Sequence, residues 1–186
     1  MCVGGEILSP PYTWAGYGYT GVSQNYLARA TYFILDFLVI IMSIIQVSDF
    51  MVIKPVTIDP DTPLIEVAIK MRENRIGSLI LVENNKPIGI ITERDLVWRV
   101  VANSLDINSL KASDVCSKPV LTISENSRVE EAMELMKEYK IRRLVVINDD
   151  DEVSGIITSD DIAINIESIS KELALEYITL SRNIRR

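Results

Sequence analysis

The seven-residue stretch Gly-Ile-Ile-Thr-Glu-Arg-Asp occupies residues 89–95, and a near copy, Gly-Ile-Ile-Thr-Ser-Asp-Asp, occupies residues 155–161. In each copy the apolar pair is typical of a buried strand, and a threonine and an aspartate stand three residues apart at the turn into a helix. A single turn of this kind is usually a helix N-cap, because the threonine and the acid satisfy free backbone N–H groups. Two short oxygen-bearing side chains at such a turn also suit the two hydroxyls of a ribose, and a helix N-terminus accepts phosphate. The residue pattern leaves both interpretations open.

The two stretches belong to an internal duplication that begins near residue 47. Residues 47–51 are echoed by residues 112–116, and the Lys-Pro-Val at residues 54–56 is echoed 64 residues later. The motif glycines are 66 residues apart. From the Lys-Pro-Val onward the offset grows by single residues, through 65 between Ile58 and Ile123, so we expect the insertions to fall in turns and the two copies to share one fold.

Each copy predicts the order strand, helix, strand, strand, helix, which is an α+β fold. The predicted strands are residues 56–58, 79–82 and 88–91 in the first copy, and residues 121–123, 144–147 and 153–157 in the second. We expect the last helix of the chain to begin near Ser168.

The first helix of each copy has a recognisable start. Thr62 and Pro63 suit a cap followed by the first helical position, and Ser127 with Glu130 suits a capping box. Apolar residues then recur at helical spacing with the same phase in both copies, which predicts a core face. These residues are Leu64, Val67, Ala68, Met71, Val129, Ala132, Met133 and Met136.

The N-terminal residues 1–41 do not resemble the repeats. Residues 1–21 are rich in Gly, Pro and Tyr without a sustained period, and residues 30–47 form the most apolar run. A membrane-spanning helix needs about 20 such residues, and this run is slightly short and contains Asp36. Three interpretations stay open: a helix packed on the following domain or on a dimer mate, a membrane anchor, or a reading frame whose true start is Met42. The expected domains are residues 1–41, 42–110, 111–170 and a C-terminal helix at 171–186.

The composition narrows the function classes. A hydrophobic content of 48% with 24% charged residues is that of a folded globular protein, and a net charge of -7 argues against non-specific binding to nucleic acid or anionic membranes. There is no histidine, and Cys2 and Cys116 are far apart. We therefore expect no disulfide framework or zinc site, a buried apolar role for Cys116, and a cytoplasmic protein. The acidic run 149–152 predicts a solvated hairpin turn, and no nucleophile–base pair is visible, so we expect no enzyme.

With both motifs complete inside two matching units, the sequence from about residue 47 to 166 resembles the cystathionine-β-synthase (CBS) domain family, whose members occur in tandem as a Bateman module. The family's nucleotide motif is a glycine, two hydrophobic residues, threonine or serine, two variable residues and an aspartate. Residues 89–95 and 155–161 both fit this motif completely. The resemblance implies two repeats packed as a pseudo-twofold pair.

The resemblance also implies site residues. Asp95 and Asp161 would accept hydrogen bonds from ribose hydroxyls, and Thr92 and Thr158 would support the ribose or phosphate. An adenine would lie in an apolar slot made by the first strand of each copy (Val56, Ile58, Leu121 and Ile123) and by the isoleucine just before the second strand (Ile76 and Ile141). The phosphates would meet Arg142 and Arg143, with Arg94 as a further donor. The second motif has Asp160 in place of Arg94, so equal occupancy of the two sites is not expected.

These implications give a function. We expect a regulatory module that binds AMP, ADP, ATP or S-adenosylmethionine between the repeats and signals the ligand to a protein partner, with no required cofactor and no metal. Two chains would pair through their helices as a homodimer. Two rival hypotheses stay open: a structural or interaction module in which the motifs are only caps, and a membrane-tethered regulator of a transporter anchored through residues 30–47.

Overall fold

The computed structural model describes residues 44–183, including all side chains as far as Glu172 and that of Leu175. The predictions for residues 1–41 and for most of the apolar run 30–47 lie outside these residues. Within residues 44–183, no helix is both long enough and apolar enough to cross a membrane.

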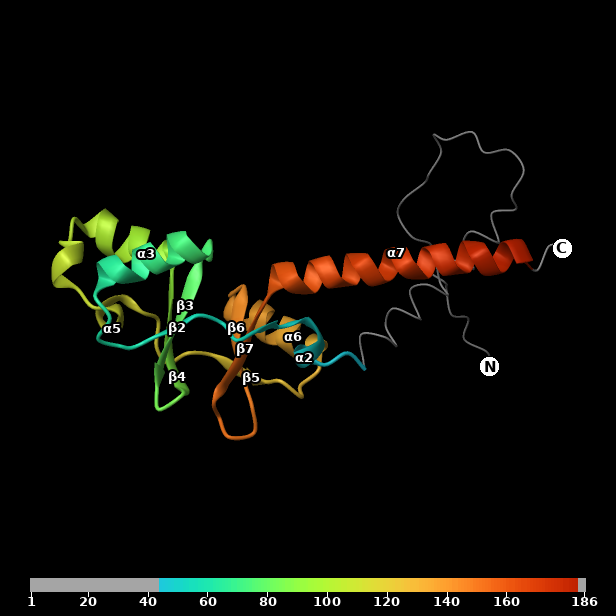
Figure 1. Ribbon diagram of the computed structural model, residues 1–186, viewed down its shortest axis with the longest axis horizontal. Helices are drawn as coiled ribbons and strands as arrows, with labels where there is room; N and C mark the ends of the chain where they lie inside the picture. Colours follow the sequence, from blue (N-terminus) through green and yellow to red (C-terminus); the bar gives the residue numbers. More distant parts are fainter. Residues whose placement is uncertain (1–43, 184–186) are drawn as a thin grey trace, which may run out of the picture. The chain divides into compact units, whose positions relative to one another are not determined.

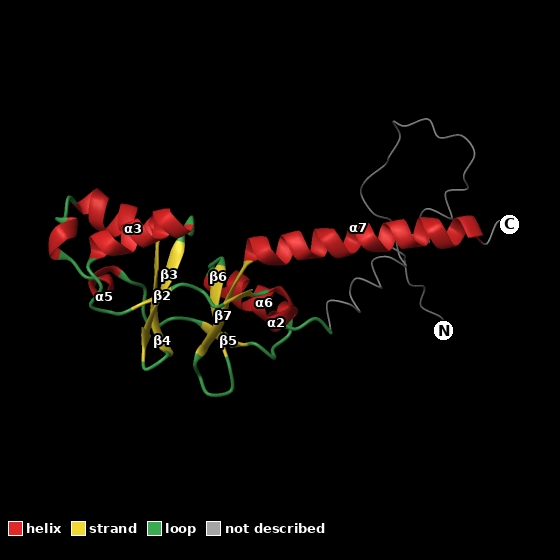
Figure 2. Cartoon of the chain, in the orientation of Figure 1, coloured by secondary structure: helices red, strands yellow, loops and turns green. Residues whose placement is uncertain are grey.

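Both copies have the predicted order of elements (Figures 1 and 2). The first contains β2 (Thr57–Ile58), α3 (Leu64–Asn74), β3 (Ser78–Glu83), β4 (Lys86–Thr92), the short α4 (Glu93–Asp95), a π-helical turn η1 (Leu96–Val100) and two 3₁₀ turns, η2 (Val101–Asn103) and η3 (Ile107–Ser109). The second contains β5 (Thr122–Ser124), α6 (Val129–Tyr139), β6 (Arg143–Ile147), β7 (Val153–Thr158) and α7 (Ser159–Asn183). Two short segments precede the copies: α2 (Val47–Phe50) with β1 (Val52–Ile53), and α5 (Ala112–Val115). The α+β fold with two repeats is confirmed.

The two sheets have the same register. In each, the first strand runs parallel to the second, and the second and third form an antiparallel hairpin, giving the orders β2-β3-β4 and β1-β7-β6-β5. Ile80 faces Ile90 in the first hairpin, and Val145 faces Ile156 in the second. The register shifts after Leu81 in one hairpin and after Val146, its counterpart, in the other. The duplication therefore extends to backbone irregularities.

The segment before each repeat packs in the core of the other repeat. Val47 and Phe50 of α2 lie in the second-repeat core, whereas Ala112 and Val115 of α5 lie in the first-repeat core. The strand β1 pairs antiparallel with β7, and Ser117 exchanges two backbone hydrogen bonds with Ile90 of β4, at 2.8 and 3.1 Å. This exchange interlocks the repeats.

The motif glycines lie where the exchanged segments cross the last strand. A Cβ atom on Gly89 would approach Cys116 Sγ to 3.0 Å, and one on Gly155 would approach Met51 Sδ to 2.5 Å and the Val52 carbonyl oxygen to 3.1 Å. Real Cβ atoms seldom come this close to other atoms, so a side chain at either position would force the Cys116 or Met51 side chain to move, and at position 155 the Val52 backbone as well. The exchange thus explains the glycine of the motif without a ligand.

The predicted helix starts were wrong for one shared reason. The residue before each helix is held extended by an antiparallel bridge to an exchanged segment, Pro63 to Lys111 and Arg128 to Gln46. Pro63 is therefore the N-cap of α3, and Thr62 does not cap it.

The corresponding change in the second copy removes the predicted capping box. Arg128 is the N-cap of α6, so the box of Ser127 with Glu130 does not form. Met133, expected in the core, is 44% exposed.

The last helix starts earlier than expected. It begins at Ser159 and not near Ser168, because Thr158 and Asp161 cap it and Ile162, Ile166 and Ile169 carry its apolar face onto the second-repeat core.

Candidate functional site

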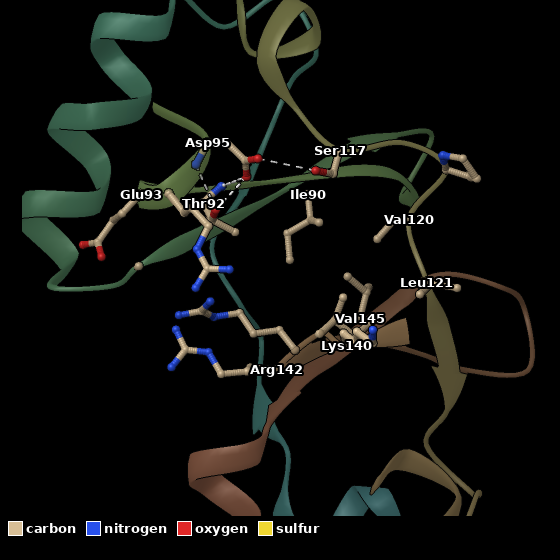
Figure 3. Close-up of a pocket in the computed structure, with 15 residues that line it drawn as sticks. Ile90, Thr92, Glu93, Asp95, Ser117, Val120, Leu121, Lys140, Arg142 and Val145 are labelled. Atoms are coloured by element: carbon tan, nitrogen blue, oxygen red, sulfur yellow. Dashed lines mark hydrogen bonds between the residues drawn. The ribbon is translucent and has the colours of Figure 1, made fainter. Parts of the chain in front are cut away.

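A cavity of about 340 Å³ lies where the first motif faces the second repeat (Figure 3). Its volume falls within the range of small-molecule sites. Figure 3 shows Thr92, Asp95 and Ser117 on one side of it and Lys140, Arg142 and Val145 on the other. The full lining comprises Gly77, Ile90, Thr92, Glu93, Arg94, Asp95, Ser117, Pro119, Val120, Leu121, Lys140, Ile141, Arg142, Arg143 and Val145.

The first motif is a closed capping box. Thr92 donates its backbone N–H and its hydroxyl to Asp95 Oδ2, at 2.9 and 2.6 Å, and the Asp95 N–H donates to Thr92 Oγ1 at 3.2 Å. The Asp95 side chain is only 13% exposed. Oδ2 thus accepts both hydrogen bonds from Thr92, and Oδ1 accepts none from it.

Asp95 Oδ1 lies beside one arginine and one hydroxyl. Arg99 Nε is 3.3 Å from this oxygen, and Ser117 Oγ is 3.5 Å from it. Arg99 also donates through Nη1 to the carbonyl oxygens of Val115 and Cys116, at 2.6 and 2.8 Å, and through Nη2 to Ser117 Oγ at 2.9 Å. The carboxylate is therefore fixed in both position and orientation.

Positive charge dominates the cavity wall. Four basic side chains line it against the acidic side chains of Glu93 and Asp95, and they come from both repeats: Arg94, Lys140, Arg142 and Arg143. Arg94 is held over the Trp98 ring, with its Cζ atom 5.1 Å from the ring centroid. Arg143 Nη2 reaches the first repeat, since it lies 3.2 Å from where a Gly77 Cβ atom would stand. Arginine guanidinium groups suit phosphate, which they bind through paired N–H donors.

The remaining wall is apolar, and it could hold a flat base. It consists of Ile90, Pro119, Val120, Leu121, Ile141 and Val145. Of the six residues predicted for a base slot, Leu121 and Ile141 line the cavity. Ile58 and Ile123 are buried in the two cores, at 5% and 6% exposure, and Val56 and Ile76 pack against the first of these cores.

The CBS domain family model matches the chain twice, at residues 47–102 and 112–168. The chain belongs to the CBS domain family. An uncharacterized protein of Methanopyrus kandleri is 44% identical over 108 residues, a match that covers 58% of this chain and 55% of the relative, so the chain spans about half of that relative's length. The CBS domain-containing protein YhcV of Bacillus subtilis is 30% identical over 134 residues, which cover 72% of this chain and 93% of YhcV.

Two similar structures are complexes with adenosine compounds. A CBS domain protein from Pyrobaculum aerophilum complexed with AMP has a TM-score of 0.59 at 27% identity, covering 67% of this chain and 99% of that protein. The CBS domain pair of protein MJ0100, in complex with 5-methylthioadenosine and S-adenosyl-L-methionine, has a TM-score of 0.60 at 27% identity, covering 67% of this chain and 98% of that chain.

The second CBS motif forms the same box but has different neighbours. Thr158 donates its N–H and hydroxyl to Asp161 Oδ2, at 3.0 and 2.6 Å. The residue four positions on is Asn165, which donates to the Asp161 backbone carbonyl at 2.8 Å and not to the carboxylate. Thr158 and Asp161 do not line the cavity described above. Their predicted role in ligand binding stays a prediction.

Several cavity residues were not anticipated from the sequence. Lys140 is the left-handed C-cap of α6, with φ of 54°, and stands two residues before Arg142. Ser117, Pro119 and Val120 belong to the connection between the repeats, and only the exchange of segments brings them to the first motif. Arg99 could have been found as the residue one helical turn after Asp95.

Cys116 is a buried free thiol in the first-repeat core, as expected from the sequence. Burial raises the pKa of the Cys116 thiol, against the opposing effects of Lys118 and Arg99. It is therefore neutral at pH 7, which makes it a poor nucleophile. Among the side chains that the structure describes, no three Cys, Asp or Glu groups are placed to hold a metal ion.

Proposed function

We propose that this chain is a regulatory CBS pair that binds an adenosine-containing ligand in the cavity at the first motif and performs no chemistry itself. The observation that carries the proposal is the combination, in one cavity, of an oriented carboxylate oxygen on Asp95, an apolar slot and four basic side chains. The ribose would bind Asp95, the base would enter the slot, and the phosphates would meet Arg94, Arg142 and Arg143. The adenosine complexes of two similar CBS structures support this choice.

The charge of the cavity selects among adenosine compounds. Four basic groups against two acidic ones favour an anionic ligand, so AMP, ADP and ATP should bind ahead of the cationic S-adenosylmethionine. Because each added phosphate brings further charge to the arginines, the affinity should rise from AMP to ATP.

A comparison of the charges at the two motifs favours one occupied site. At the second motif, Ser159 and Asp160 replace Glu93 and Arg94. The positions equivalent to Arg142 and Arg143 carry Gly77 and Ser78. A phosphate there would meet an acidic side chain and fewer cations. The cavity at Asp95 should therefore fill first.

Signalling would use the interlocked repeats. Both repeats line the cavity, so a ligand that prefers one relative arrangement of them shifts the population toward that arrangement. A protein partner that reads the arrangement would complete the regulatory role. A reducing compartment such as the cytoplasm suits the free thiol of Cys116.

We also propose that two chains associate through their helices. Exposed apolar side chains gather on the first repeat's helical elements, with Val97 at 52%, Trp98 at 65% and Val101 at 69% exposure on η1 and η2. Large exposed apolar groups of this kind are typical of an interface. One similar structure is a hexameric CBS-CP12 protein, 27% identical with a TM-score of 0.60, covering 64% of this chain and 67% of that one.

Isothermal titration calorimetry of the full chain with AMP, ADP, ATP and S-adenosylmethionine tests the proposed function. The expected order of affinity is ATP above ADP above AMP above S-adenosylmethionine, with the ATP affinity falling as salt is added because phosphate contacts are screened. Flat traces for all four compounds would favour the rival hypothesis of a structural module whose motifs are only helix caps.

A further inference from the structure

The guanidinium group of Arg99 connects the first motif to the segment between the repeats. Nε pairs with the Asp95 carboxylate, Nη1 donates to the carbonyls of Val115 and Cys116, and Nη2 donates to the Ser117 hydroxyl. The first partner is the candidate ribose acceptor. The other three belong to the segment 115–117, which connects the repeats.

We propose that Arg99 is a positioning residue that couples ligand binding at Asp95 to the order of the segment 115–117. This inference rests on the proposed function, because it assumes that a ribose binds Asp95. It adds a physical connection through which a ligand bound in the cavity would order the segment between the repeats.

The proposed coupling begins at Asp95 Oδ1. Thr92 occupies Asp95 Oδ2, so a ribose hydroxyl must approach Oδ1, which is the oxygen that Arg99 holds at 3.3 Å. The Arg99 side chain is 46% exposed, so water competes for its pair with Asp95. Asp95 lines the cavity and Arg99 does not, so a ligand in the cavity excludes water from the Asp95 side of the pair, which strengthens the charged hydrogen bonds that remain.

The segment 115–117 is placed to respond. Ser117 lines the cavity and pairs through its backbone with Ile90, and Arg99 binds the same segment from the side of η1. When the pair of Arg99 with Asp95 is strengthened, the guanidinium group is fixed, and its bonds to the Val115 and Cys116 carbonyls are fixed with it. By linkage, the ordered segment favours ligand binding to the same extent.

The second repeat lacks this connection. Asn165 occupies the place of Arg99 and bonds to the Asp161 backbone, and within residues 44–172 the Asp161 carboxylate receives hydrogen bonds from Thr158 alone. The two boxes have nearly the same geometry. Arg99 is thus an addition to the first motif and not a requirement of the cap.

Hydrogen exchange of the full chain, measured by mass spectrometry with and without saturating ATP, tests the proposal. In the wild type, ATP should slow exchange of the amides in segment 115–117 by about five-fold or more, the lower end of typical coupling between sites. Arg99→Lys keeps the charge, but an ammonium group cannot reach the carboxylate and both carbonyls together. This variant should still bind ATP, more weakly, and protect residues 92–95 without protecting segment 115–117.

Arg128→Lys is the matched control, because Arg128 makes an exposed pair with Glu131 and does not line the cavity. It should behave as the wild type. Full ATP-dependent protection of segment 115–117 in Arg99→Lys, or ATP binding to the wild type without that protection, would overturn the coupling and leave the proposed function intact. No ATP binding to the wild type would overturn both.

Discussion

Gly155→Ala should destabilise the protein without any change to the candidate site. The added methyl group would stand 2.5 Å from Met51 Sδ, 3.0 Å from Met51 Cγ and 3.1 Å from the Val52 carbonyl oxygen. The Met51 side chain can rotate away, but the Val52 carbonyl belongs to β1, which pairs with β7 at this point. Forcing a methyl group into such a contact costs about 1–3 kcal/mol. The expected loss in the free energy of unfolding lies in this range.

Urea denaturation followed by circular dichroism measures this loss, and thermal melting should show a decrease of about 3 °C for each kcal/mol. Met51→Ala in the same chain should recover part of it, because the closest contact is removed, whereas the Val52 contact remains. Gly89→Ala is the matched comparison: its closest contact is 3.0 Å to Cys116 Sγ, so its cost should be smaller. A Gly155→Ala protein as stable as the wild type would refute the crossing of β1 over the motif glycine.

Three further predictions concern charge, the thiol and association. Arg142→Met should weaken ATP binding by about 10- to 100-fold in calorimetry, the loss of one charge-assisted hydrogen bond, whereas Lys137→Met on the exposed side of α6 should leave the affinity unchanged; equal effects would contradict a local phosphate contact. Burial raises the pKa of the Cys116 thiol above its ordinary 9.0, so the folded protein favours the neutral thiol. The stability that the neutral thiol contributes is fully present below pH 9.0 and is lost as the pH rises through the pKa of the folded protein. Native Cys116 should therefore alkylate far more slowly than the unfolded chain at pH 7, and equal rates by mass spectrometry would contradict its burial. Val97→Glu should shift the protein from dimer to monomer in sedimentation velocity, while an unchanged dimer would place the interface elsewhere.

The repeat pattern predicted most of the fold because the apolar spacing of each element is local. The same spacing at residues 64–71 and 129–136 predicted α3 and α6, and the paired apolar runs predicted the hairpins. The helix starts failed because Pro63 and Arg128 are held by bridges to segments about 50 and 80 residues away in the chain. A pairing over that distance leaves no mark in local periodicity.

The candidate site, like the fold, was predicted where its residues are close in the sequence and missed where they are not. Thr92 and Asp95 were visible in the motif, since the box that they form is built from residues three apart. The resemblance to the CBS family implied that Ile58 and Ile123 belong to the base slot, but these residues are buried in the two cores. In a two- or three-residue strand a shift of one residue exchanges the core face for the cavity face, and the sequence does not set that register.

The contribution of Ser117 and of the second-repeat arginines to one cavity depends on how the repeats pack. The sequence placed Arg142 and Arg143 in the second copy, and the structure brings them to the motif of the first. Arg142 and Arg143 thus line the same cavity as Arg94, which was expected as a further donor and stands 48 positions before Arg142 in the chain.

Calorimetric titration of ATP into the full chain and two variants tests whether an adenosine ligand binds at Asp95. Asp95→Asn and Asp161→Asn remove one negative charge each from boxes of nearly the same geometry, and the asparagine side-chain oxygen can still accept the backbone hydrogen bond of Thr92 or Thr158. Asp95→Asn should weaken ATP binding at least about ten-fold, the effect of one hydrogen bond to a charged group, while Asp161→Asn should change it little. Equal affinities in the wild type and Asp95→Asn, or a larger loss in Asp161→Asn, would contradict ligand binding at Asp95.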